Sequence, residues 1–189
     1  MFYRVWFGLT ITAYVLIAQG ELGIDLASKL ADPRSRDALV ASSAVSAGDY
    51  TALFLAWSKD PPKGVDKREL DIGLSKAFGR LRTKEAIHFL INNIGLELWQ
   101  RDNIWMKAPE VIEGQFPAVA ALIAIGPDAS KALVASPLDK MSPGESRLAI
   151  FAISRIADPG ARSFLMSLHP TGIEAYFVQE GLKAIGEHP

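Results

Sequence analysis

The sequence predicts an all-α protein, because helical signals recur along the chain and strand signals do not. Apolar residues repeat at helical spacing within 70–81, 149–156 and 173–185, as they do on the buried face of an amphipathic helix. No segment alternates apolar and polar residues over six positions with β-branched enrichment, and no Asn-Gly or Asp-Gly turn occurs. We therefore expect helices joined by turns.

Three of the predicted helices begin with a recognisable N-terminal signal. In each, a side chain that can cap the first turn is followed three residues later by Glu, which is the pattern of a capping box. Pro143 at a first helical position supports one of them, since proline has no N–H for a helix start to leave unpaired. The pairs are Asp66 and Glu69, Ser142 and Glu145, and Thr171 and Glu174.

Composition excludes several classes of protein. The chain has 189 residues, 49% of them hydrophobic, so it can bury a continuous core and is too apolar and too weakly charged to be disordered. Twenty basic residues against 21 acidic ones give a net charge of −1, which argues against nucleic acid as the main partner. The absence of Cys excludes disulfides, thiolate metal sites and thiol nucleophiles.

Residues 1–20 have the pattern of a signal peptide. One positive charge at Arg4 precedes the uncharged run 5–20, which is short for a bilayer-spanning helix of about 20 apolar residues. The run ends in Ala18-Gln19-Gly20, a small-x-small cleavage pattern. We expect cleavage there and a mature chain of residues 21–189 that is periplasmic or secreted. The alternatives are an uncleaved membrane anchor over 5–20, which would be the chain's contact with a membrane, and a buried first helix.

Four later segments share one pattern. Each has a large aliphatic residue, a short polar or Pro-containing break, and a helix that ends at Leu. An Asp or Thr in the break would cap the next helix, and the Ala and Gly positions would let neighbouring helices approach closely. A two-helix unit cannot bury its apolar stripe alone, so successive units should stack and share one core. The segments are 30–39, 81–90, 125–133 and 156–165.

These segments resemble the short HEAT-like repeats of bilin-lyase-related proteins. Residues 158–187 are the fullest match, with Asp158-Pro159, a helix to Leu165, a break, and a helix that ends in Ile185-Gly186. The resemblance covers about residues 24–189 and implies an α-solenoid of about four stacked antiparallel helical hairpins. It implies a scaffold and no particular ligand, because none of the matched residues belongs to a catalytic motif.

Two stretches interrupt the repeat and are predicted to be insertions, which map to loops in a solenoid. Residues 58–65 follow Trp57 and contain a stiff pair of prolines. Residues 96–114 place Trp, Met and Arg among polar residues, as at interface hot spots. They predict a binding patch, unless the tryptophans only fill the space between misaligned repeats. The candidate binding residues are Trp57, Trp99, Arg101, Trp105 and Met106.

The sequence contains no recognisable catalytic or metal-binding motif. His88, His169 and His188 are the only histidines, and none has a second His at metal-ligand spacing. Neither a nucleophile elbow, a phosphate-binding glycine loop nor a calcium loop occurs. The carboxylates are scattered, so only the fold could assemble a catalytic pair. We therefore expect no enzymatic activity, no metal and no cofactor.

The sequence favours an exported, non-catalytic scaffold that binds a protein or peptide, through a groove of successive second helices or through the insertions. The alternative is a small-molecule-handling enzyme or accessory subunit on the same scaffold, which a pocket with His88 or two carboxylates would favour. End-to-end self-association is a further expectation, because the ending Ile185-Gly186-Glu187 suggests an uncapped last unit.

Overall fold

Every regular element in the part of the chain that the structure describes is helical. The computed structural model describes residues 23–42, 50–98 and 108–187, and these contain α-helices and short 3-10 helices without a strand. The predicted all-α class is confirmed. The predicted signal peptide, residues 1–20, lies outside the described residues.

The first described element is a helix over residues 23–31. The further elements are α2 (Arg36–Ala41), α4 (Thr51–Lys59), α5 (Lys67–Leu81), η1 (Lys84–Ala86), α6 (Ile87–Asn92), α7 (Pro109–Gln115), α8 (Pro117–Ile125), α9 (Pro127–Val134), η3 (Leu138–Lys140), α10 (Pro143–Ile156), η4 (Pro159–Ala161), α11 (Arg162–Ser167) and α12 (Ile173–Glu187).

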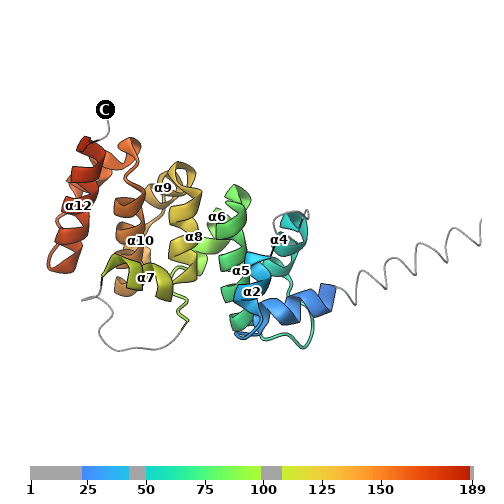
Figure 1. Cartoon of the computed structure of the whole chain (residues 1–189). Helices are drawn as coiled ribbons and strands as arrows, with labels where there is room; N and C mark the ends of the chain where they lie inside the picture. Colours follow the sequence, from blue (N-terminus) through green and yellow to red (C-terminus); the bar gives the residue numbers. More distant parts are fainter. Residues whose placement is uncertain (1–22, 43–49, 99–107, 188–189) are drawn as a thin grey trace, which may run out of the picture.

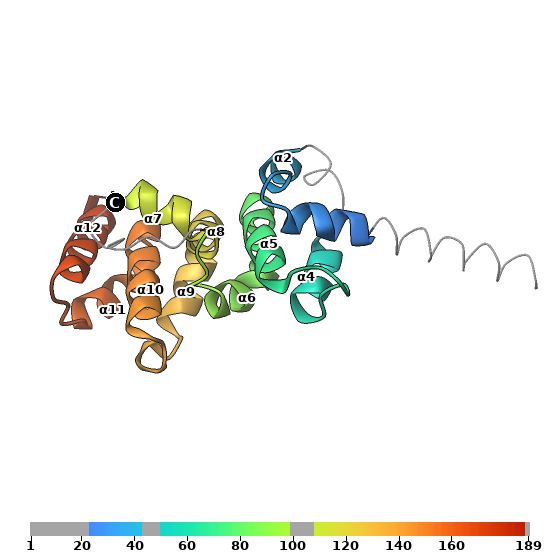
Figure 2. The same cartoon turned by 90° about the horizontal axis from the view of Figure 1, so that it is seen from below.

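The helices form an elongated row (Figure 1). Along its middle, α5 packs against α8, α8 against α10, and α10 against α12. Figure 2 shows α4, α6, α9 and α11 on one side of these helices and α2 and α7 on the other. Here α6 contacts α8, α9 contacts α10, and α11 contacts α12, while α7 covers α8 from the opposite side.

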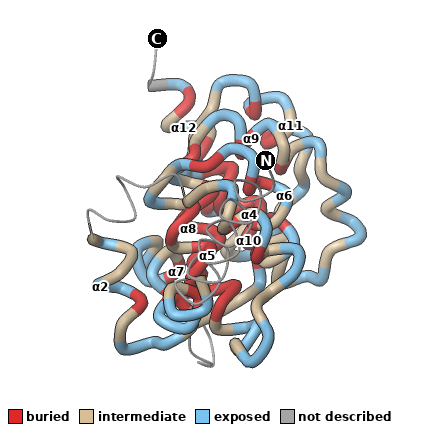
Figure 3. Tube along the Cα trace, turned by 90° about the vertical axis from the view of Figure 1, so that its right-hand side faces the viewer, coloured by how far each residue is buried: buried red, intermediate tan, exposed pale blue. Residues whose placement is uncertain are grey.

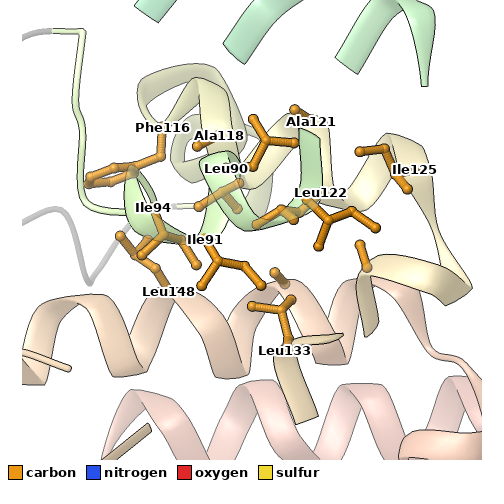
Figure 4. Packing of buried hydrophobic residues seen from close by; sticks show 14 of the residues in the cluster. Leu90, Ile91, Ile94, Phe116, Ala118, Ala121, Leu122, Ile125, Leu133 and Leu148 are labelled. Atoms are coloured by element: carbon orange, nitrogen blue, oxygen red, sulfur yellow. The ribbon is translucent and has the colours of Figure 1, made fainter. Parts of the chain in front are cut away.

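Helix α8 and residues 148–154 of α10 are buried because they are apolar around most of their circumference, whereas α5 and α12 each keep an exposed polar side. All residues of α10 from 148 to 154 are buried, as are most of α8. In Figure 3 the buried positions lie inside the row and the exposed ones around it. Figure 4 shows how α6, α8 and α10 share one cluster, in which Leu90, Leu122 and Leu148 are at most 1% exposed. Each such side chain contributes roughly 1.5–3 kcal/mol through removal from water.

Glycines bring the central helices into backbone contact. A Cβ placed on Gly79 of α5 would lie 2.9 Å from Cα of Ala121 in α8, and one on Gly181 of α12 would lie 2.8 Å from Cα of Ser154 in α10. A Cβ on Gly73 would overlap the carbonyl of Leu30 in the helix before α2. These interfaces therefore depend on the absence of a side chain.

Two of the three predicted capping pairs form. The third does not, because α12 begins at Ile173 directly after Gly172, whose φ is +60°, no described hydrogen bond from its first turn reaches Thr171, and Glu174 pairs with Arg147 instead. The carboxylate of Asp66 accepts the Glu69 N–H at 2.9 Å at the start of α5, and Ser142 with Glu145 forms a capping box at α10. In the break before α2, Asp32 accepts the Arg34 N–H at 3.1 Å and the Ser35 hydroxyl at 3.0 Å. These hydrogen bonds, the backbone one first, lower the pKa of Asp32. Three breaks also place Pro at the first helical position, namely Pro127, Pro143 and Pro159.

A buried arginine attaches the first helices to α5. The side chain of Arg36 is 3% exposed, and its Nε donates to the carbonyl of Leu30 at 2.8 Å. Its Nη2 donates to the carbonyl of Ala31 at 3.0 Å and to Glu69 Oε2 at 2.6 Å. The guanidinium thus satisfies the last carbonyls of one helix and the first-turn carboxylate of another.

The two predicted insertions differ in structure. Residues 60–66 form an irregular connection between α4 and α5 that contains Pro61 and Pro62. The stretch 96–114 is not only a loop, since α7 begins at Pro109 within it. Ile112 and Phe116 are buried against the row, so this short helix has an apolar face that makes it part of the core.

The last helix presents a mainly polar surface to solvent. Ile185 is buried, whereas Gln179, Glu180 and Lys183 are exposed. Polar outer faces are what terminal repeats need for solubility. The exposed surface of α12 also includes Tyr176, which is 48% exposed, and end-to-end self-association stays a prediction.

None of the described helices is by itself both long and apolar enough to cross a bilayer. The pair α8 and α9 would pass by length and composition together, but it is bent by 114° at the break between them.

We expect the glycine contacts to be sensitive to a single methyl group. Gly79→Ala and Gly181→Ala should each lower the free energy of unfolding by about 1–3 kcal/mol, because the added Cβ meets backbone atoms that cannot move separately. Gly114→Ala in α7, where a Cβ meets nothing within 4 Å, is the control and should be neutral or stabilising by up to about 1 kcal/mol. Urea unfolding followed by circular dichroism measures all three. Equal stability of the three variants would contradict the close-contact argument.

Candidate functional site

A groove of about 670 Å³ lies between α6, α9 and the turn that follows α9. We call it the α6–α9 groove. One wall is a single face of α6, with His88, Ile91 and Asn92 at i, i+3 and i+4. The other wall is one face of α9 and contains Lys131 and Ala132. Residues 136–141 close one end, with η3 among them.

The α6–α9 groove has an apolar floor and a polar rim. Ile91 is nearly buried, and Ala132 and Met141 are half-buried. His88 and the lysines at 131 and 140 are exposed. A ligand in this groove would therefore meet hydrogen-bond donors at the rim and hydrocarbon below them.

Charges in the α6–α9 groove are not balanced. Asp128 lines it, and its Oδ2 pairs with Lys84 Nζ at 2.5 Å, a hydrogen bond that raises the pKa of Lys84. Lys131 and Lys140 have no ion-pair partner among the described residues. The lining therefore holds two cations that are not neutralised.

A second pocket, of about 440 Å³, lies at the start of α10 and brings together two carboxylates, Glu97 and Glu145. Both are engaged in structural hydrogen bonds. Glu97 Oε2 accepts from Gln115 Nε2 at 3.1 Å, and Glu145 Oε2 accepts the Ser142 N–H at 2.9 Å. Hydrogen bonds from the Ser142 hydroxyl and then its N–H lower the pKa of Glu145. A general acid needs a raised pKa, so Glu145 is unsuited to that role in a two-carboxylate hydrolase.

A third hollow, between α7, α10 and α12, is about 140 Å³ and is smaller than typical ligand sites of about 300–1,000 Å³. Phe151 and Phe177 line it and Tyr176 is exposed beside them. Arg155 of α10 pairs with Glu113 of α7 at 2.9 Å and fixes α7 over this hollow. Its size and lining suit one apolar side chain.

Of the sequence-predicted site residues, only Trp57 lies within the residues that the structure describes. Trp57 lies in α4 with its ring centroid 5.7 Å from that of Phe54, and it is only 7% exposed, so it serves the core. The other candidates lie outside the described residues, and the binding patch they predict stays a prediction. They are Trp99, Arg101, Trp105 and Met106.

Sequence reasoning identified His88 as a residue to look for in a pocket, and it does line the α6–α9 groove. Lys131 and Lys140 were not predicted, because the sequence around an exposed lysine does not show which other helix will form a groove with it. Within the described ranges, no group of three or more His, Cys, Asp or Glu could hold a metal ion.

Acid should remove the contribution of Glu145 to stability. Because its folded-state pKa is lowered, this contribution is present above the ordinary glutamate pKa of about 4.3 and is lost as the pH falls through the folded value. Glu145→Ala should cost about 0.5–1 kcal/mol at neutral pH, and the difference from the wild type should shrink below about pH 4. Urea unfolding across this pH range measures it. Ser142→Ala is the matched partner, and the two losses should not add. A difference that stays constant down to about pH 3 would refute this prediction.

Comparison with known proteins finds no matching family model, no matching curated protein and no matching solved structure. The function of the chain is therefore inferred from its own surfaces.

Proposed function

We propose that the chain is an exported HEAT-like α-solenoid that acts as a non-catalytic scaffold for a protein or peptide partner. The order of the helices supports this. The antiparallel units would be α4 with α5, α6 with α8, α9 with α10, and α11 with α12, and the second helix of each packs on the second helix of the next. Serial stacking of this kind is what a repeat array requires.

The proposal of peptide binding rests on the α6–α9 groove. It is open at the surface, and its volume of about 670 Å³ is within the range of ligand sites. Its donor-rich rim over an apolar floor can pair with a peptide backbone and hold a side chain below. The groove is formed by first helices and not by the expected second helices. The second helices α8 and α10 cannot form it, because they are buried inside the row.

The alternative, a small-molecule-handling enzyme or accessory subunit, is favoured by His88 in the α6–α9 groove. A catalytic His is usually oriented by a carboxylate or activates a neighbouring hydroxyl. No described hydrogen bond joins His88 to such a group, and the carboxylate in the same lining, Asp128, is paired with Lys84. Binding without chemistry is therefore the better proposal.

Export is testable by mass spectrometry. We expect the protein produced with its leader in a bacterial host to be recovered from the periplasm or medium without residues 1–20, starting at Glu21. A variant with Gly20→Leu, which removes the small residue of the cleavage pattern, should keep the leader and remain with the membrane. Recovery of the intact wild-type chain from the cytosol would contradict export.

Peptide binding is testable by selection from a displayed library of random twelve-residue peptides. We expect the wild-type protein to enrich peptides that Ala135→Trp no longer binds, because an indole at this exposed groove position fills the space. Fluorescence polarisation with the enriched peptides measures the loss.

Ala56→Trp, on an exposed position of α4 that does not line the α6–α9 groove, is the matched control and should bind like the wild type. Circular dichroism shows that each variant is folded. The proposal is wrong if no peptide is enriched, or if Ala135→Trp binds the enriched peptides as well as Ala56→Trp does.

A further inference from the structure

We propose that the α6–α9 groove recognises an acidic peptide segment that also carries an apolar side chain. The inference rests on the proposed function and adds the chemistry of the partner. Lys131 and Lys140 would pair with two acidic side chains, and the floor beside Ile91 would take the apolar one.

The positive charge of the groove favours an acidic partner. Lys84 neutralises Asp128 through their ion pair, and this leaves Lys131 and Lys140 as uncompensated cations of the lining. The whole chain has the opposite balance, with 20 basic and 21 acidic residues. A local positive potential on a slightly acidic protein favours an acidic partner and disfavours a basic one.

The hydrogen-bond donors of the groove also favour an acidic partner. Lysine donates and does not accept, and the amide of Asn92 can donate from the α6 wall. The one carboxylate in the lining, Asp128, already has a cationic partner. A partner rich in carboxylate oxygens satisfies these donors, whereas a partner rich in ammonium groups would leave them facing like charges.

The size and floor of the groove select a peptide over a small anion. A lone phosphate or carboxylate would occupy little of about 670 Å³ and would leave Met141 and Ala132 in contact with water. An extended segment with an apolar residue between acidic ones would cover the hydrocarbon and reach both lysines. This combination of apolar burial and charge pairing gives both affinity and specificity.

The test reverses the two charges and measures the library-selected peptides again. We expect the enriched peptides to be acidic, and the double variant Lys131→Glu/Lys140→Glu to bind them on the order of tenfold more weakly or worse. Raised salt should weaken the wild-type complex, because exposed charge pairs are screened. The control is Arg80→Glu/Arg162→Glu, which makes the same change of charge on two exposed cations of α5 and α11 that do not line the groove, and it should bind like the wild type.

The possible outcomes separate this inference from the proposed function. Failure of the wild type to enrich any peptide overturns both. Peptides that Ala135→Trp loses but that are neutral or basic, or that bind the Lys131→Glu/Lys140→Glu variant unchanged, overturn only the acidic specificity. Displacement of the selected peptides by inorganic phosphate at equal ionic strength overturns it in favour of a small-anion site. If charge reversal disturbs folding, Lys131→Gln/Lys140→Gln gives the same comparison with neutral side chains.

Discussion

Backbone contact between neighbouring helices is the constraint on which the row depends. Gly79 allows α5 to lie directly on α8, and Gly181 allows α12 to lie directly on α10. At this spacing the apolar faces on both sides of the row close into one cluster. The groove depends on another contact in the same row. Because α6 packs on α8 and α9 packs on α10, the distance between α8 and α10 sets the separation of the groove walls.

Most charged side chains with defined partners hold the backbone in place. Arg36 joins the first helix to α5, Glu145 closes the start of α10, and Arg155 fixes α7 through Glu113. Such pairs give geometric order more than net stability when they are exposed. Lys131 and Lys140 have no described ion pair, and they differ from other such cations, for example Lys59, in that they share one groove.

Local signals in the sequence predicted where helices form better than they predicted what each helix packs against. Periodicity and capping patterns depend on residues three or four positions apart, so Asp66 and Ser142 were placed correctly at helix starts. Helix α7 was missed because its few turns show no repeated stripe. Trp57 was assigned to binding because an aromatic residue looks the same in a core and on a surface, although Phe54 three residues earlier marks the same buried face.

The groove was beyond the reach of the sequence for a different reason. Residues 88–92 and 128–135 each define one helix face, but their meeting depends on how α8 and α10 pack beneath them. A ligand that touches both walls would therefore bridge two neighbouring units of the proposed solenoid. In an array where stability is a sum of units and interfaces, such a ligand stabilises the interface it spans. Binding and the integrity of the row would then be thermodynamically linked, because a ligand on both walls would favour the folded contact between α8 and α10 beneath them.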